Sequence, residues 1–247
     1  MHFTYYQDQY CYYFRKPAGI PSSFGKEFSF LDLLVQEQRN PQIQEIFLSL
    51  SSFFSPAEEY GLLNRLDNDT SGLLYFAKNP QVKKQFKELQ GNLFVHKYYL
   101  AEVYGDVTPL MKGGAEGGGF DTAENPPSSP FPQFGWGAVQ KGVYDISYPI
   151  MHHKFTPDRM VVIRTDSDRN KAKGREHQLT TKLLEYDYNT SKRTSIVLVE
   201  IQKGIRHQIR VHLAAIGYPI CGDTLYSKSD HKEYPMLQLY SVGLETS

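Results

Sequence analysis

The sequence predicts an α+β fold with a central mixed, mostly antiparallel β-sheet flanked by helices and loops. Short apolar or alternating runs, typical of strands, are interspersed with segments that carry apolar residues at helical spacing. They lack the regular β-α-β alternation of a parallel sheet. At 247 residues, with 40% hydrophobic and 22% charged residues, the chain also has the size and composition of an ordinary globular domain. We therefore expect one domain over residues 1–247.

The first half of the chain alternates predicted strands and helices. Pro17 ends the first predicted strand. Before the predicted helix at 81–89, Asn79 is available as the cap and Pro80 takes the first helical position. The predicted strands are 10–14, 73–77 and 98–104, and the predicted helices are 28–37 and 81–89.

The second half begins after a change of composition. Residues at about 112–137 are rich in glycine, proline and serine without an apolar period, so we expect a flexible insert there. Further strands are predicted at 142–146, 148–150, 159–163 and 195–201. A helix is predicted at 206–217, with Gly217 as its stop.

Composition argues against several classes of protein. Two cysteines, Cys11 and Cys221, cannot form a disulfide framework, and the eight histidines show no metal-binding spacing. We expect reduced thiols and no metal. No apolar run approaches the roughly 20 residues that span a bilayer, and no signal peptide is recognisable, so we expect a cytoplasmic protein. Lys+Arg and Asp+Glu balance at 27 each, which argues weakly against broad, non-specific nucleic-acid affinity.

The most informative segment is 65–72, which precedes the predicted strand at 73–77. It places Asp67 between Arg65 and a Thr70-Ser71-Gly72 turn, where a carboxylate can be oriented and partly desolvated. The alternative is a turn with no chemical role, because Asp, Asn, Thr, Ser and Gly all favour turns through local hydrogen bonds.

Four segments carry a recognisable pattern. They are Arg15-Lys16-Pro17-Ala18-Gly19, then Arg65-Leu66-Asp67 with Thr70-Ser71-Gly72-Leu73-Leu74, then Lys97-Tyr98-Tyr99-Leu100-Ala101-Glu102-Val103-Tyr104-Gly105, and finally Gly204-Ile205-Arg206-His207-Gln208-Ile209-Arg210-Val211-His212-Leu213 through Gly217-Tyr218-Pro219-Ile220-Cys221-Gly222-Asp223. Together, in this order, they resemble the RluA family of RNA pseudouridine synthases. The resemblance covers about Tyr12 to Glu245, interrupted by the insert.

The resemblance implies a catalytic domain that isomerises uridine to pseudouridine in structured RNA, either rRNA or tRNA. The reaction breaks the bond from ribose C1′ to uracil N1 and rejoins the base through C5, so no cofactor is expected. Asp67 would be the catalytic carboxylate, as a nucleophile or as a base that takes a ribose proton. Tyr99 would stack on uracil, and Arg210 would pair with Asp67 and hold its charge. Without the resemblance, the sequence favours a core tyrosine at Tyr99, and Arg210 reads just as readily as a surface helix arginine.

The resemblance also implies substrate contacts. A stacked uridine must be flipped out of the RNA, and Arg65 is the residue assigned to that step, the alternative being an ion pair with Asp67 or Asp69. Leu239, with Leu237, would wall the uracil pocket, although core leucines need no function. The other expected substrate-binding residues are Thr70, Lys16, His207 and Gln208.

Some positions depart from the family pattern. Asn64 replaces the usual histidine, and Ile205-Arg206 replaces the usual arginine and threonine. Tyr240 replaces a common histidine. These replacements put the RNA contacts at the rim of the site in doubt. We expect no S4-type RNA-binding module ahead of Tyr12, and a monomer. Two alternatives remain: an inactive RNA-binding relative of the same fold, and a glycoside hydrolase that uses Asp67 with Asp69.

Overall fold

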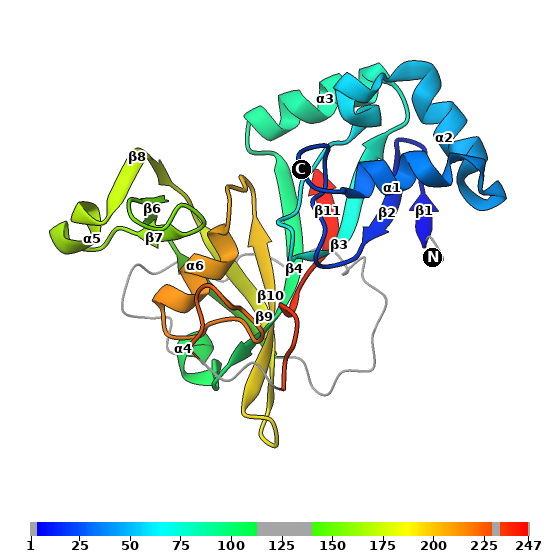
Figure 1. Ribbon diagram of the computed structural model, residues 1–247. Helices are drawn as coiled ribbons and strands as arrows, with labels where there is room; N and C mark the ends of the chain where they lie inside the picture. Colours follow the sequence, from blue (N-terminus) through cyan, green and yellow to red (C-terminus); the bar gives the residue numbers. More distant parts are fainter. Residues whose placement is uncertain (1–3, 113–139, 229–232, 247) are drawn as a thin grey trace.

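The computed structural model describes residues 4–112, 140–228 and 233–246. Its main element is an eight-stranded sheet in the order β1-β2-β3-β11-β4-β10-β9-β5 (Figure 1). All neighbouring strands are antiparallel except β3 and β11. The strands are β1 (Tyr5–Gln7), β2 (Cys11–Lys16), β3 (Ser71–Ala77), β4 (Val95–Tyr104), β5 (Gln140–Ile146), β9 (Thr181–Asn189), β10 (Thr194–Ile201) and β11 (Leu239–Thr246). The predicted mixed, mostly antiparallel α+β fold is confirmed.

The helices of the first half pack beside β1 to β3 (Figure 1). Three of them have a side-chain cap at the N-terminus: Ser29 for α1, Asn40 for α2 and Asn79 for α3. Asn79 and Pro80 take the cap and first helical positions expected from the sequence. The helical segments are α1 (Phe30–Gln36), η1 (Glu37–Arg39), α2 (Pro41–Phe53), η2 (Pro56–Gly61) and α3 (Pro80–Gly91).

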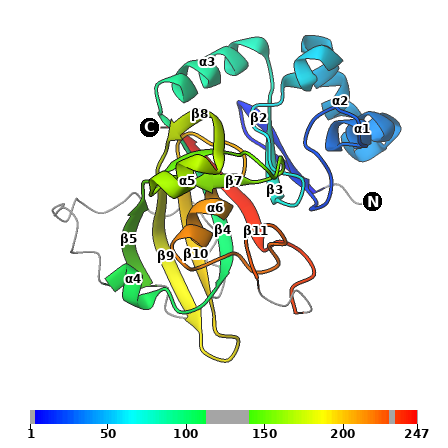
Figure 2. The ribbon, with the colours of Figure 1, turned by 60° about the vertical axis from the view of Figure 1, so that its left-hand side comes forward.

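A second, three-stranded sheet, here called the small sheet, has the order β7-β6-β8 and lies beside α6 (Figures 1 and 2). Its strands are β6 (Pro149–His153), β7 (Met160–Val162) and β8 (Ala172–Gln178). The remaining helices are α4 (Thr108–Lys112), α5 (Asp166–Asn170) and α6 (Gln208–Ala215). Apart from Lys112, which ends α4, the glycine-rich insert expected at 112–137 lies outside the described residues.

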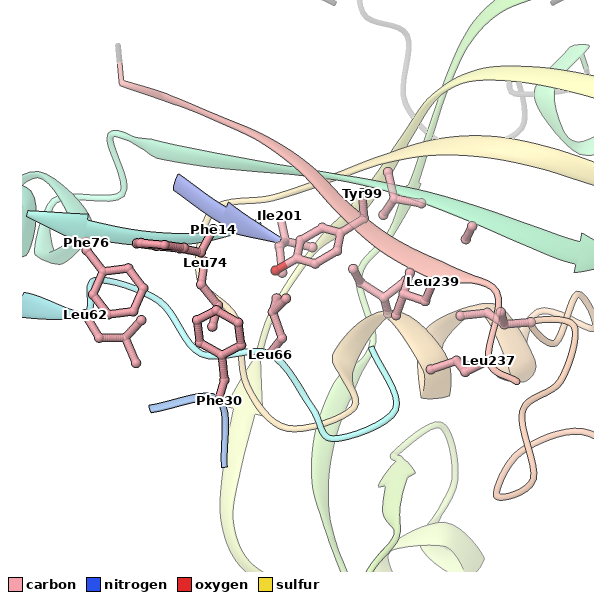
Figure 3. Close-up of a cluster of buried hydrophobic side chains, with 14 of the residues drawn as sticks. Phe14, Phe30, Leu62, Leu66, Leu74, Phe76, Tyr99, Ile201, Leu237 and Leu239 are labelled. Carbon is pink, nitrogen blue, oxygen red and sulfur yellow. The ribbon is translucent and has the colours of Figure 1, made fainter. Parts of the chain in front are cut away.

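The main core fills the space between the large sheet and the helices. Figure 3 shows part of it, where Phe14, Leu74 and Phe76 from β2 and β3 meet Phe30 of α1. Tyr99, Ile201 and Leu239 continue this apolar cluster from β4, β10 and β11. The core therefore reaches the point where the segment before β3 lies against the centre of the sheet.

Gly72 allows β11 to enter the sheet between β3 and β4. Its φ is +116°, and a Cβ atom there would lie 2.2 Å from the carbonyl oxygen of Ser241. Because β11 pairs with β3 in parallel at Ser71 and Gly72, a side chain at position 72 would separate the two strands. The glycine of the Thr-Ser-Gly turn is thus required by the packing of β11.

Candidate active site

The residues expected to carry chemistry surround one cleft of about 1420 Å³. One side is formed by the segment before β3 and by α3, and the other by the residues that lead into α6. Asp67, Tyr99 and Arg210, which are far apart in the sequence, all line this cleft. So do Arg65, Thr70 and Leu239, whereas Lys16 is not among its lining residues.

The segment that carries Asp67 is fixed by hydrogen bonds to the N-terminal loop. The Ser22 hydroxyl donates to the Leu66 carbonyl at 2.9 Å and accepts the Leu66 N–H at 2.9 Å. On the other side of Asp67, the Asn68 carbonyl accepts the Gly19 N–H at 2.8 Å. Asp67 is therefore held from both of its neighbours, which limits the positions that its carboxylate can adopt.

Lys16 completes this attachment. Its side chain is fully buried, and its ammonium donates to the carbonyls of Pro17, Ile20 and Asn68 at 2.8, 2.7 and 3.0 Å. Since an ammonium has three donors, all of them are used inside the protein. Burial lowers the pKa of Lys16 to about 8, while the carboxylates of Asp69 and Asp67 oppose that change. Lys16 therefore orders the loop around Asp67, and the expected substrate contact by its side chain remains a prediction.

Asn64, at the position where the family pattern has histidine, also has a structural contact. It is buried, its amide nitrogen donates to the Leu73 carbonyl at 3.1 Å, and its amide oxygen accepts the Tyr75 N–H at 2.8 Å. These bonds fasten the segment before Asp67 to β3. The departure from the pattern thus preserves the placement of Asp67.

The surroundings of Asp67 both raise and lower the pKa of its carboxyl group. Burial raises the pKa of its carboxyl above the ordinary value, and the negative charge of Asp69 adds to this. The positive charges of Arg210 and Arg206 and a hydrogen bond from the His207 backbone N–H lower it. The site therefore holds a partly desolvated carboxylate next to three groups that stabilise its ionised form.

Arg210 is buried, and its hydrogen bonds go to a residue that the sequence analysis did not assign. Its Nε and Nη2 donate to the two carboxylate oxygens of Asp223, each at 2.8 Å, and Asp223 is fully buried. Asp223 also accepts the backbone N–H groups of Leu225 and Tyr226. The expected direct pairing of Arg210 with Asp67 is corrected: Arg210 is fixed by Asp223 and acts on Asp67 through its charge.

The two acidic residues next to Arg210 differ in burial and in their distance from the guanidinium. Asp223 ends the sequence block 217–223 that carried the resemblance, and this position was the available signal for its role. Asp69 is half exposed, and its carboxylate lies 3.7 Å from Nη1 of Arg210. Asp69 therefore belongs to the charge network of the site and is more than a turn residue.

His207 contributes through its backbone. It precedes α6 in the left-handed conformation, with φ 56° and ψ 15°, which is unusual for a residue with a side chain. Its ring nitrogen Nδ1 lies 3.0 Å from the Tyr226 hydroxyl, and burial together with the charges of Arg210 and Arg206 lowers its pKa to about 4. One ring nitrogen of His207 is therefore engaged within the protein, while the backbone N–H faces Asp67. His207 also lines the cleft, and a substrate contact by its side chain remains a prediction.

Gln208 is likewise used inside the fold. It is buried, and its amide nitrogen donates to the Thr180 carbonyl at 3.0 Å and to the Thr181 hydroxyl at 3.3 Å. These bonds join the start of α6 to β9. Gln208 thus helps to hold α6, and with it Arg210, against the sheet. It also lines the cleft, and a substrate contact by its side chain remains a prediction.

Tyr99 and Leu239 form the apolar wall of the cleft. Figure 3 shows the Tyr99 ring next to Ile201, with Leu66 and Leu239 nearby. Tyr99 is buried, and both burial and the charge of Asp67 raise the pKa of its hydroxyl. Among the described residues, none hydrogen-bonds that hydroxyl. A neutral aromatic ring beside a carboxylate can hold a planar base by stacking.

Arg65 is exposed at the edge of the cleft, whereas Thr70 is buried. The Arg65 side chain is 67% exposed and pairs with Glu59 at 2.8 Å, so neither Asp67 nor Asp69 is its partner. An exposed pair of this kind is weak, and Arg65 is free to exchange it for another anion. Thr70 is buried, and its N–H donates to the Asp67 carbonyl at 3.1 Å, which closes the turn after the carboxylate. Substrate contacts by both residues remain predictions.

Two searches of the described residues gave negative results. No group of three or more His, Cys, Asp or Glu side chains is placed to hold a metal ion in the part of the chain that the structure describes. Over the same residues, no helix has both the length and the apolar character needed to cross a membrane.

Comparison with known proteins gives consistent matches. The family model described as RNA pseudouridylate synthase matches residues 10–215. A ribosomal large subunit pseudouridine synthase D from Buchnera aphidicola is 26% identical over 92% of this chain and 55% of its own length. A dual-specificity RNA pseudouridine synthase RluA from Vibrio vulnificus is 26% identical over 91% of this chain and 69% of its own length. The chain spans about half the length of the first curated relatives, between 43% and 55%.

A solved structure supports the fold. Human RNA Pseudouridylate Synthase Domain Containing 1 superposes with a TM-score of 0.64 at 18% identity. The superposition covers 98% of this chain and 78% of the human chain. At this identity the likeness concerns the arrangement of the elements, and it agrees with the mixed sheet described above.

Proposed function

This chain belongs to the family of RNA pseudouridylate synthases, and from that membership we propose that it isomerises uridine to pseudouridine in structured RNA. The RluA-type resemblance read from the sequence is confirmed by the relatives named RluA and by the family match. The observation that carries the proposal is the convergence of Asp67, Tyr99 and Arg210 on one cleft. Ribosomal RNA is the first substrate to test, because several relatives are named for the large ribosomal subunit.

The proposed chemistry begins at Asp67. Its carboxylate acts in the ionised form. It either attacks C1′ of the ribose or the uracil ring as a nucleophile, or accepts a proton from the ribose. The charges of Arg210 and Arg206 and the N–H of His207 favour that form. The pair of electrons from the broken C1′–N1 bond stays on uracil, which turns in the cleft until C5 bonds to C1′. The proton leaves C5 and N1 ends protonated, so no atom is gained or lost.

The rest of the cleft keeps the detached base in place. Tyr99 and Leu239 supply an apolar wall against which uracil can turn without escaping, and the buried core behind them excludes water. Arg65, exposed at the rim, is proposed to leave Glu59 and interact with the RNA when the uridine is flipped out. Asp223 acts through Arg210 as a positioning residue, because it fixes the guanidinium from the side away from solvent.

The deciding experiment compares pseudouridine maps of total RNA from cells with and without the gene. Deletion is expected to remove one or more sites, and the wild-type gene to restore them. Asp67→Asn is expected to restore none, with a loss of turnover in vitro of roughly a thousandfold or more, as when a reacting group is removed. If deletion changes no site and purified Asp67→Asn still binds RNA like the wild type, the inactive RNA-binding alternative is favoured instead.

A further inference from the structure

Outside the cleft, the small sheet carries an excess of positive charge in a chain that is neutral as a whole. Residues 149–178 include seven Lys or Arg and four Asp or Glu. The basic residues are Lys154, Arg159, Arg164, Arg169, Lys171, Lys173 and Arg175, and the acidic ones are Asp158, Asp166, Asp168 and Glu176. Three histidines, His152, His153 and His177, lie in the same range.

The acidic residues do little to neutralise the exposed strand β8. Glu176 pairs with Arg169 at 2.7 Å, and Asp168 caps α5. Among the described residues, Lys171, Lys173 and Arg175 make no ion pair, and all three are exposed. β8 is an edge of the small sheet, so Lys173 and Arg175 stand on an accessible rim, and Lys171 directly precedes the strand.

Cations on β8 also lie next to cations or histidines on neighbouring segments. His152 is directly opposite Lys173 in the β6–β8 pairing, and the N–H of Lys154 donates to the Lys171 carbonyl at 2.7 Å. Burial lowers the pKa of His177, and the charges of Arg175, Lys203 and His152 lower it further. Like charges placed opposite one another in a sheet cost stability unless an anion lies between them.

An exposed aromatic ring stands in the middle of these charges. Phe155, in the connection from β6 to β7, is 71% exposed. The Lys154 ammonium lies 5.4 Å from its ring centre, and the His153 ring meets it edge-on at 6.1 Å. His153 is in turn fixed, because its Nδ1 accepts the Thr156 N–H at 3.0 Å. The ring is thus presented by an ordered connection.

This connection also reaches the cleft. Asp158, three residues after Phe155, lines the cleft and lies 3.3 Å from Nη2 of Arg206. Arg206 is next to His207, whose N–H faces Asp67. The β6–β7 connection therefore contacts the segment that leads into α6, and this segment reaches the site of the proposed reaction.

We propose that the small sheet and its β6–β7 connection bind the RNA strand that flanks the target uridine, with Lys171, Lys173 and Arg175 on phosphates and Phe155 stacked on an unpaired base. This inference rests on the proposed function and names the surface through which the substrate is recognised. Cations without an ion-pair partner can bind the phosphates of a polyanion, and an exposed aromatic ring among them can stack on a nucleobase. An acidic protein would satisfy the cations but has no base for the ring, so RNA is the better fit.

The first test measures the salt dependence of binding to a fluorescein-labelled oligouridylate by fluorescence anisotropy. The variant K171A/K173A/R175A is expected to lower the slope of log affinity against log salt by about 2, since each single-strand phosphate contact contributes about 0.7. The matched control K26A/K141A/K192A removes the same charge from exposed positions elsewhere and should keep the wild-type slope. Equal slopes in the two triple variants, or no binding by the wild type, would overturn the proposal.

The second test concerns stacking. Phe155→Ala is expected to weaken oligouridylate binding by about 5- to 150-fold, corresponding to roughly 1–3 kcal/mol per stacked base, while Phe155→Trp retains binding. Phe53→Ala removes a ring from the exposed face of α2 and serves as the control. If Phe155→Ala binds like Phe53→Ala, the stacking role is wrong.

Pseudouridine mapping with the same variants separates this inference from the proposed function. If the wild type modifies RNA and the variants bind and modify it equally well, the inference fails and the function stands. If no RNA is modified by the wild type but the variants lose binding as predicted, the function fails and the RNA-binding surface stands.

Discussion

At the scale of single residues, Asp69 provides a test of the charges around Asp67. Its negative charge raises the pKa of Asp67, so Asp69→Asn is expected to lower that pKa. In the proposed mechanism Asp67 acts in the ionised form, so the rate is expected to fall when Asp67 is protonated. The acid limb of kcat/KM against pH should therefore move to lower pH in Asp69→Asn. The profile is measured with the RNA that the mapping experiment identifies.

Asp166→Asn gives the control for this profile, because Asp166 is an exposed acidic residue of α5. It changes the net charge equally and should leave the acid limb in place. Since Asp69 is half exposed, neither substitution is expected to unfold the protein. An acid limb that moves to higher pH in Asp69→Asn would contradict the assignment, because it would mean that Asp69 acts mainly by holding Arg210.

The residue scale also shows what the sequence could not reveal. Asp67, Tyr99 and Arg210 were found because each stands in a motif, and the structure brings all three to the cleft. The partner of Arg210 was missed, because which carboxylate meets a buried guanidinium depends on how α6 packs against the turn at residue 223. Likewise, a motif cannot show that His207 is used through its N–H.

At the scale of elements, local signals predicted most of the first half. The cap and proline at Asn79-Pro80 identified α3, and the apolar run after Gly72 identified β3. The same signal at Asn40-Pro41, which starts α2, was overlooked. β8 and β9 were missed because their exposed faces are charged and the apolar pattern is interrupted. A single domain over the whole chain remains a prediction.

The N-terminal loop and the Asp67 segment behave as one element joined by Lys16. Lys16→Met removes the ammonium donor from the part-buried carbonyls of Pro17 and Ile20, at a cost of roughly 1–3 kcal/mol for each unsatisfied group. The Asn68 carbonyl also loses the ammonium but keeps the Gly19 N–H. We expect the free energy of unfolding, measured in urea, to fall by about 2 kcal/mol or more. Turnover should fall as well, because the Asp67 segment loses its attachment.

Lys192→Met is the matched control, because Lys192 is exposed in the turn between β9 and β10, away from the cleft, and should change stability by less than about 0.5 kcal/mol. The comparison also distinguishes the two roles considered for Lys16. If Lys16→Met is as stable as the wild type but binds RNA more weakly, Lys16 is a substrate contact as the motif first implied, and the structural role is wrong.

At the scale of the whole molecule, two buried histidines join distant elements and make the fold sensitive to acid. The ring of His212 in α6 lies 2.8 Å from the Thr181 hydroxyl of β9 and 3.0 Å from the Tyr148 carbonyl before β6. His207 meets Tyr226 at the other end of the same segment. Burial lowers the pKa of both rings to about 4. Protonation therefore disfavours the packing of α6 between the two sheets.

The sign of the effect follows from proton binding. The ordinary histidine pKa is 6.5, so between pH 6.5 and about 4 the unfolded chain binds more protons than the folded protein. Stability is complete above pH 6.5 and is lost as the pH falls, by up to about 3 kcal/mol for each histidine. Asp67, whose pKa is raised, has the opposite sign and offsets a part of this loss.

We expect the melting temperature to fall steadily from pH 6.5 to pH 4. His212→Asn should melt below the wild type at neutral pH, because it loses a hydrogen bond, but its melting temperature should change less with pH, because an amide does not titrate in this range. His152→Asn, at an exposed position of β6, should follow the wild-type curve. Parallel curves for His212→Asn and the wild type would show that another group causes the acid sensitivity.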